Sequence, residues 1–490
     1  MNESVREMPV AGERVRVPIG DLTSRGWGVG RTADGLVVMV RGAVPGDEVD
    51  ARIREVHRGH VEAEIDALVV LAPRRCEPFC THFGLCGGCA LQQIPGAEQR
   101  RAKTERLRRL LAKFAGVPAA LVEDARAVGP DTGFRNRMEF CLAPGPDGPI
   151  LGLHEAGGDV FDLTECHLPH PDIVHLAHEV RRIVREHSIP VHDPSGKVEG
   201  LTRVDIRRAG GGAILITLRA RGDISPAEVA PLAALTTASI PARGVVLAPG
   251  RARVRPPGPG EAGAGRPRPG MASPASPPDV SSGHVVAGEP EIRETLLGLE
   301  VALTGQTFIQ THAAGAEALY QTALGWLEVI PGGSLLDLYA GLGLLAQAGA
   351  GKRRRVVAVE SSRAAVQAGR RAAARNRREV RFVCATAHRA LASLAAERRS
   401  FPLAVANPPR AGLHRSIAPG LARLGVTRLS YISCDGATLA RDVARLARVD
   451  LKLRRVVPFD LFPHTAGLEA VALFARTRPP ARPGRRRPGR

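Results

Sequence analysis

The chain has 490 residues, 44% of them hydrophobic and 24% charged, which is enough for about three globular domains with cores of their own. Its 68 Lys and Arg against 49 Asp and Glu leave a formal charge of +19, a balance that favours a polyanionic partner such as nucleic acid. The apolar runs fall short of the roughly 18–20 residues of a membrane-spanning helix, and the opening residues lack the apolar stretch of a secretory signal. We therefore expect a cytoplasmic protein without membrane contact that works on nucleic acid.

Residues 8–70 have the pattern of a small β-barrel. Apolar and polar residues alternate over 14–17, 36–40 and 47–56, which predicts short strands. Glycines that favour turns stand around these stretches, at Gly26, Gly28, Gly30, Gly35, Gly42 and Gly46. Short strands with closely spaced turns are typical of a closed, OB-like barrel.

A group of cysteines follows the barrel. Among the 8 cysteines, Cys80, Cys86 and Cys89 form a Cys-x5-Cys-Gly-Gly-Cys motif, whose glycines let the backbone fold around a bulky inorganic core. In a reducing compartment this group is more typical of a metal centre than of disulfides. An iron–sulfur cube needs a fourth thiolate, for which Cys166 is the best candidate, although zinc also accepts four sulfurs. Spacing and glycine content favour iron and sulfide, and we expect the remaining Cys76, Cys141 and Cys384 to be small buried side chains.

The middle of the chain, 71–300, predicts a mixed α+β domain. A basic helical run covers about 97–115, and strands are expected at 159–163, 203–208 and 213–218. Residues 249–283 are rich in Pro, Gly, Ser and Ala and cannot bury enough apolar surface to offset their ordering entropy, so we predict a disordered insertion. The basic tail, 479–490, has the same character.

Residues 301–478 predict a doubly wound α/β domain. Apolar strands at 334–338, 355–360, 380–383, 403–406 and 428–433 alternate with helices, the pattern of a parallel sheet. The strand at 334–338 runs into a glycine turn where backbone amides can approach a ligand, and Glu360 ends the next strand, where a carboxylate can accept both ribose hydroxyls. Because Ala346 replaces the last glycine of the dinucleotide pattern, we favour S-adenosylmethionine over a nicotinamide cofactor.

Two further strand ends carry chemistry. Asn407-Pro408-Pro409-Arg410 follows one strand with a rigid turn, since the prolines cannot continue the strand. Cys434 follows another at the active edge of the sheet, where it is either a nucleophile or buried filler.

Several motifs resemble those of the RNA uracil-5-methyltransferase family, and in particular of its iron–sulfur members that modify ribosomal RNA. In the order of that family they are CTHFGLCGGCALQQ, FRNRMEF, FIQTH, LLDLYAGLG, NPPRAG, SCDGATLARD and PFDLFPHTAGLE. The opening segments GDLTSRGWGVGR and VRGAVPGDEV resemble the TRAM RNA-binding barrel of the same family. The resemblance covers nearly the whole chain except 249–283 and the tail, and several ordered motifs make it specific.

The resemblance implies a mechanism and a set of site residues. A Cys434 thiolate would add to uracil carbon 6 and make carbon 5 nucleophilic toward the methyl group of S-adenosylmethionine, and Glu469 would then remove the carbon 5 proton as general base. The cofactor site would be lined by Gln310, Tyr339, Gly341, Leu344, Glu360, Thr386 and Asn407. Cys80, Cys86, Cys89 and Cys166 would hold a [4Fe–4S] cluster with a structural or RNA-positioning role. The expected partner is RNA, ribosomal rather than transfer RNA, and no protein partner is predicted.

The chain departs from the family pattern at several positions. Here Asn407 replaces the Asp usual in the family, Ala340 a Cys and His312 an Asn. Asp435-Gly436 replaces Asn-Pro, and Gly467-Leu468 replaces His-Val. Because Asp435 adjoins the nucleophile, we expect it to raise the pKa of the Cys434 thiol.

Two other functions fit parts of the pattern. Asn-Pro-Pro is a signature of amino-methyltransferases, but these place an aromatic residue where Arg410 stands and have no use for Cys434. A non-catalytic RNA-binding or assembly factor with a drifted site is the other alternative, against which the presence of both Cys434 and Glu469 argues.

Overall fold

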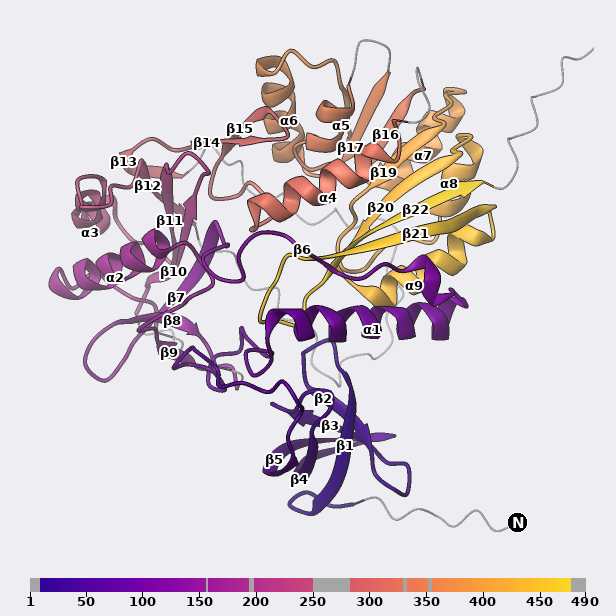
Figure 1. Ribbon diagram of the computed structural model, residues 1–490. Helices are drawn as coiled ribbons and strands as arrows, with labels where there is room; N and C mark the ends of the chain where they lie inside the picture. The colour runs from indigo at the N-terminus through magenta and orange to yellow at the C-terminus, as the bar shows by residue number, and fades with distance from the viewer. Residues whose placement is uncertain are drawn as a thin grey trace, which may run out of the picture.

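The computed structural model describes residues 9–155, 157–193, 198–249, 283–328, 333–350 and 355–476. Over these residues the chain forms a closed barrel, a seven-stranded sheet, a two-stranded ribbon and an eight-stranded sheet (Figure 1). The predicted insertion at 249–283 lies almost wholly outside the described residues, and the predicted tail at 479–490 lies wholly outside them. None of the described helices is long and apolar enough to cross a bilayer.

The N-terminal strands close into the predicted barrel, in the order β1-β2-β3-β5-β4. The strands are β1 (Arg14–Leu22), β2 (Gly28–Arg31), β3 (Val37–Arg41), β4 (Glu48–His57) and β5 (His60–Val70). Alternate residues such as Val38, Val49 and Val61 fill the interior and are fully buried. Gly28 and Gly30 were predicted in turns but lie within β2, because β2 passes so close to β1 that a Cβ on Gly30 would stand 2.1 Å from the Pro18 carbonyl oxygen.

The central sheet has the order β13-β12-β11-β10-β7-β8-β9. Its strands are β7 (Arg137–Ala143), β8 (Ile150–His154), β9 (Val160–Asp162), β10 (Gly200–Arg208), β11 (Ile214–Arg221), β12 (Gly244–Pro249) and β13 (His284–Gly288). The sheet packs against α2 (Pro171–Glu186), α3 (Pro226–Val229) and the 3-10 helix η2 (Ala230–Thr236). Helix α2 buries Leu176 and Val180 against Phe140 and Ile206 of the sheet, as its apolar spacing requires.

The C-terminal sheet has the order β18-β17-β16-β19-β20-β22-β21-β6, and the five strands predicted from the sequence form its parallel part. These are β16 (Leu335–Leu338), β17 (Val356–Glu360), β18 (Arg381–Cys384), β19 (Leu403–Ala406) and β20 (Arg428–Ser433). Two antiparallel strands that the sequence analysis missed continue the sheet, β21 (Leu451–Asp460) and β22 (Glu469–Arg476).

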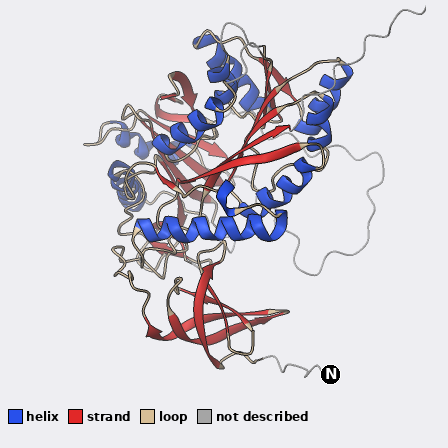
Figure 2. Cartoon of the chain, turned by 45° about the vertical axis from the view of Figure 1, so that its right-hand side comes forward, coloured by secondary structure: helices blue, strands red, loops and turns tan. Residues whose placement is uncertain are grey.

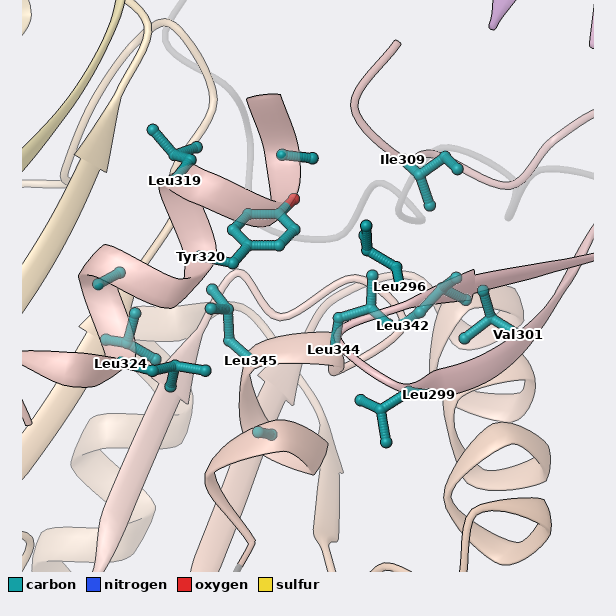
Figure 3. Close-up of a cluster of buried hydrophobic side chains, with 14 of the residues drawn as sticks. Leu296, Leu299, Val301, Ile309, Leu319, Tyr320, Leu324, Leu342, Leu344 and Leu345 are labelled. Carbon is teal, nitrogen blue, oxygen red and sulfur yellow. The ribbon is translucent and has the colours of Figure 1, made fainter. Parts of the chain in front are cut away.

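Helices cover both faces of this sheet (Figure 2). They are α4 (Ala313–Gly325), α5 (Leu344–Gly349), α6 (Arg363–Arg375), α7 (Ala387–Ala396), α8 (Ile417–Arg423) and α9 (Gly436–Ala447). On one face, leucines of the ribbon formed by β14 (Ile292–Leu296) and β15 (Leu299–Leu303) meet Tyr320 of α4 and Leu345 of α5 in a continuous apolar cluster (Figure 3).

Helix α1 (Gly96–Ala115) joins the barrel to the C-terminal sheet (Figure 1). Its Leu107 and Leu111 are buried in the same core as Leu439 of α9. The chain continues through the 3-10 helix η1 (Ala119–Leu121) to β6 (Arg126–Ala127), which pairs with β21 at the edge of the sheet. This stretch falls within the predicted central domain, 71–300, yet it packs on the sheet of the predicted 301–478 domain; the boundaries themselves stay a prediction.

Candidate active site

A cavity of about 3050 Å³ runs between the barrel, α1, the central sheet and the C-terminal sheet. It is lined by groups from all of these parts, among them Arg25 of the barrel, Arg106 of α1, Arg137 of β7 and Cys434 beyond β20. The cavity therefore collects side chains that lie more than 400 positions apart in the sequence.

Cys434 and Glu469 lie at neighbouring strand ends in this cavity. Cys434 follows the last residue of β20, and Glu469 is the first residue of β22. Ser433 pairs with Ala470 in the antiparallel ladder, so the next position on each strand places Cys434 opposite Glu469. Cys434 is half-buried and Glu469 is 4% exposed. The structure thus brings the predicted nucleophile and the predicted base together.

The environment of Cys434 mainly disfavours the thiolate. Burial raises the pKa of the Cys434 thiol, the Glu469 carboxylate raises it further, and the Arg410 guanidinium lowers it. Asp435 also raises this pKa, but by less than burial or Glu469, and its carboxylate caps α9 by accepting the Thr438 N–H at 2.8 Å. The Arg106 guanidinium also interacts with Asp435. The expected effect of Asp435 on the thiol is therefore present but minor.

Glu469 has the protonation behaviour of a base that works near neutral pH. Burial raises the pKa of its carboxyl to about 7, and a hydrogen bond from the Gln310 side chain and the charge of Arg410 oppose that rise. A carboxyl of this pKa exchanges its proton readily between pH 6 and 8. Arg410, which the sequence analysis treated only as the residue that replaces an aromatic ring, thus acts on both Cys434 and Glu469.

The glycine turn after β16 is held in place by two carboxyl groups. Glu360 accepts the Gly341 N–H at 2.9 Å and the Ser362 N–H at 2.8 Å. Asp337, fully buried in β16, accepts the Ala346 N–H at 3.0 Å, and burial raises the pKa of its carboxyl to about 8. Gly343 has a φ of 68°, and a Cβ there would meet the Phe382 ring at 2.8 Å, so this turn requires glycine.

Most of the residues predicted to line a cofactor site share the large cavity. These are Gln310, Tyr339, Gly341, Leu344, Glu360 and Asn407. Thr386 lines a second cavity of about 490 Å³, which shares Tyr339 and Glu360 with the first. Tyr339 has a φ of 59°, an uncommon backbone conformation for a bulky residue that strained functional sites often show.

The four predicted ligand cysteines, Cys80, Cys86, Cys89 and Cys166, also line the large cavity. Two contacts tie the loop of the first three to the segment of the fourth: the Thr81 N–H donates to Glu165 at 2.7 Å, and the Thr164 N–H donates to His82 at 3.2 Å. Burial raises the pKa of Cys89 to about 12 and that of Cys166 to about 11. Of the remaining cysteines, Cys141 is buried as expected. The expectation was wrong for Cys76, which lies on a surface loop, and for Cys384, which ends the edge strand β18.

The four thiols are not drawn together tightly. Within the described residues, the group of three or more possible ligand atoms within 4.8 Å of one another is His57, His60 and Glu62, so no three of the four sulfurs are that close to one another. The Gly88 N–H points at the Cys86 sulfur at 3.4 Å. The partly buried Arg135 guanidinium interacts with Cys89 and Cys166, and its Nε has no hydrogen-bond partner.

Comparison with known proteins agrees with this architecture. The profile of the tRNA (Uracil-5-)-methyltransferase family matches residues 299–477, and that of the TRAM domain matches residues 11–65. The 23S rRNA (uracil(1939)-C(5))-methyltransferase RlmD of Pseudomonas entomophila is 31% identical over 485 residues, covering 96% of this chain and 98% of that protein. An uncharacterized RNA methyltransferase of Geobacter sulfurreducens is 28% identical, covering 96% of this chain and 91% of its own length.

Among solved structures, the fold is similar to that of the Pyrococcus abyssi tRNA (uracil-54, C5)-methyltransferase in complex with S-adenosyl-L-homocysteine. The TM-score is 0.69 at 22% sequence identity, and the match covers 94% of this chain and 100% of that one.

Proposed function

Because the chain belongs to the RNA (uracil-5-)-methyltransferase family and is an enzyme of that kind, we propose a specific reaction for it. It methylates carbon 5 of one uridine in 23S ribosomal RNA through a covalent Cys434 adduct. The observation that carries the proposal is the placement of Cys434 opposite Glu469 in the large cavity, beside the glycine turn after β16. A nucleophile and a base on adjoining strand ends can act on two neighbouring carbons of one flat ring.

The reaction balances with these two residues. The Cys434 thiolate forms a bond to uracil carbon 6, and the electron pair of the 5,6 double bond moves to carbon 5. Carbon 5 then takes the methyl group that S-adenosylmethionine supplies, leaving S-adenosylhomocysteine. Glu469 removes the proton from carbon 5, the double bond forms again, and the Cys434 thiolate leaves. Because the ring must be reached from both faces, the base has to leave its stack and enter the cavity.

Residues around the glycine turn are suited to hold S-adenosylmethionine. Glu360 ends β17 with a carboxylate whose position is fixed by backbone N–H donors, so its oxygens are oriented for ribose hydroxyls. Asn407 follows β19 and replaces an acidic family residue with a neutral amide, which leaves one negative charge fewer beside the substrate. Tyr339 and Thr386 meet at the second cavity on the same side of the sheet.

Arginines from several parts of the chain line the cavity beside eight Asp and Glu side chains. They are Arg25, Arg41, Arg106, Arg135, Arg137, Arg219, Arg371 and Arg410. Arginine pairs with phosphate in a bidentate geometry, and fixed positive charge in a cleft raises the local concentration of a polyanion. The named relatives that match over nearly their full length act on 23S ribosomal RNA, which favours that substrate over transfer RNA.

We further propose that Cys80, Cys86, Cys89 and Cys166 hold a [4Fe–4S] cluster. Methyl transfer from S-adenosylmethionine needs no electron transfer, so the role is to fix the loop and the RNA at the cavity wall. Anaerobically purified protein should be brown and contain iron and sulfide, and Cys89→Ser should lose both. Cys76→Ser is the matched control, since Cys76 is exposed at the start of the same loop. Colourless protein that contains zinc would contradict the cluster.

The substrate is tested by mapping 5-methyluridine in cells with and without the gene. Loss of one 5-methyluridine in 23S ribosomal RNA, restored by the wild-type chain and not by Cys434→Ala, is the expected result. A loss confined to transfer RNA would contradict the ribosomal substrate and leave the reaction intact, whereas methylation at an exocyclic nitrogen would contradict the reaction.

A further inference from the structure

The hairpin that joins β4 and β5 gathers two histidines and two glutamates on one face of the barrel. His57 pairs with His60 across the turn, and Glu55 pairs with Glu62 two positions further from it. Residues directly opposite in a ladder share a face, and so do residues two apart on one strand. All four side chains therefore stand on the same side of the ribbon.

These side chains converge closely. One ligand atom from each of His57, His60 and Glu62 lies within 4.8 Å of the other two. The two imidazole rings are stacked, with centroids 4.6 Å apart and planes inclined by 18°. Nε2 of His57 stands 3.4 Å from a Glu55 oxygen and 3.9 Å from a Glu62 oxygen. Three possible donor atoms thus lie close to one another, and a Glu55 oxygen stands beside one of these residues, His57.

The contacts within the group leave two carboxylates opposite each other and one imidazole nitrogen without a hydrogen bond, and a bound cation would stabilise both features. Two carboxylates directly opposite each other in a ladder destabilise it through like-charge repulsion. Nε2 of His57 is shielded from solvent and has no hydrogen-bond partner. Arg25 approaches Glu62 at 3.5 Å, at the limit of a hydrogen bond, and its guanidinium also lies over the Trp27 ring. Neither contact satisfies the shielded nitrogen or separates the two carboxylates.

We infer that His57, His60 and Glu62 bind one divalent transition-metal ion, for which zinc is the best candidate. Glu55 or a water molecule would take the fourth coordination position. Two imidazoles and a carboxylate are a common zinc donor set, whereas calcium and magnesium prefer sites made of oxygen alone. The ion would pull the two strands together at the hairpin tip, next to Arg25, which lines the large cavity. This site contains no sulfur and is separate from the four cavity cysteines.

The full-length protein tests this with metal content and spectroscopy. After equilibration with limiting free Zn²⁺, the wild type should retain one more equivalent of zinc than His60→Ala. His175→Ala should retain as much as the wild type, because His175 is an exposed imidazole on α2. Glu62→Gln keeps both imidazoles and should weaken zinc binding at this site at least about tenfold. Far-UV circular dichroism of the variants checks that the barrel is intact.

Cobalt distinguishes the hairpin from the cysteines. The Co²⁺ spectrum of the wild type minus that of His60→Ala should show ligand-field bands without thiolate-to-metal charge transfer, as nitrogen and oxygen ligands require. Equal zinc content in the wild type and His60→Ala would overturn the inference, and so would a difference spectrum dominated by thiolate charge transfer.

Discussion

Glu469 is 4% exposed, and burial raises the pKa of its carboxyl to about 7. Below that pH the carboxyl is protonated and cannot accept the carbon 5 proton, so the rate of proton removal should fall as the pH drops through about 7. Glu469→Gln should lower this rate by about 10²–10⁴-fold and accumulate the methylated adduct on Cys434. Release of tritium from carbon 5 of labelled uridine in RNA measures the step.

The matched control for that experiment is Glu328→Gln, because Glu328 is an exposed glutamate outside the cavity lining. It should leave both the rate and its pH profile unchanged. A Glu469→Gln enzyme that releases tritium at the wild-type rate would show that another group takes the proton.

Arg410 is the positive charge that acts on both reactive groups. It lowers the pKa of Cys434 and of Glu469, so Arg410→Met should raise both values and move the pH–rate profile of methylation toward higher pH. Arg389→Met, at an exposed position on α7, should leave the profile in place. If Arg410→Met lowers the methylation rate at every pH but does not shift the profile along the pH axis, Arg410 acts in RNA binding alone.

Sequence patterns predicted which residues end strands, but not how neighbouring charges change the pKa values of those residues. Cys434 and Glu360 were found because each ends or follows an apolar strand. The joint influence of Arg410 could not be seen, since it depends on the approach of three separate loops in space. Asp435 was expected to raise the pKa of its neighbour Cys434, and it does, but the pattern could not show that the more distant Glu469 raises that pKa more.

Among the elements, the parallel strands were predicted well and the antiparallel pair was not. Continuous apolar runs between helices identify buried parallel strands. Residues 469–476 form an Ala-rich apolar run that fits a helix as well as a strand, and Pro458 argues against a strand at 451–460. β2 was missed because its glycines suggested turns, although close contact with β1 requires them in the strand.

Helix α1 is anchored by a buried ion pair, whose disruption should destabilise the fold. Lys103 donates to Asp460 at 2.7 Å and to the Phe462 carbonyl at 3.0 Å, and both charged side chains are 2% exposed or less. Lys103→Ala would leave the Asp460 charge buried without its partner, which costs about 3–5 kcal/mol of unfolding free energy. Urea unfolding at pH 7 measures the loss.

An exposed pair on the same helix provides the comparison. Arg101 donates to Glu98 from a side chain that is 70% exposed, so Arg101→Ala should cost at most about 1 kcal/mol. If Lys103→Ala is no more destabilising than Arg101→Ala, the buried pair does not hold α1 against the sheet.

At the scale of the whole molecule, one cavity connects the barrel, the cysteine loop and the pair of Cys434 and Glu469. The sequence predicted each of these parts, but their common cavity depends on α1 spanning the distance from the barrel to the C-terminal sheet (Figure 2). In the proposed function, an RNA bound by the barrel and the cysteine loop would present a single base to Cys434 in this cavity.

Covalent trapping tests the central claim most directly. RNA that carries 5-fluorouridine, incubated with the protein and S-adenosylmethionine, should yield a denaturation-stable protein–RNA adduct, because fluorine cannot leave carbon 5 as a proton does. Cys384→Ala should form the adduct like the wild type, since Cys384 is exposed at the edge strand, and Cys434→Ala should form none. An adduct of undiminished yield in Cys434→Ala would contradict the account.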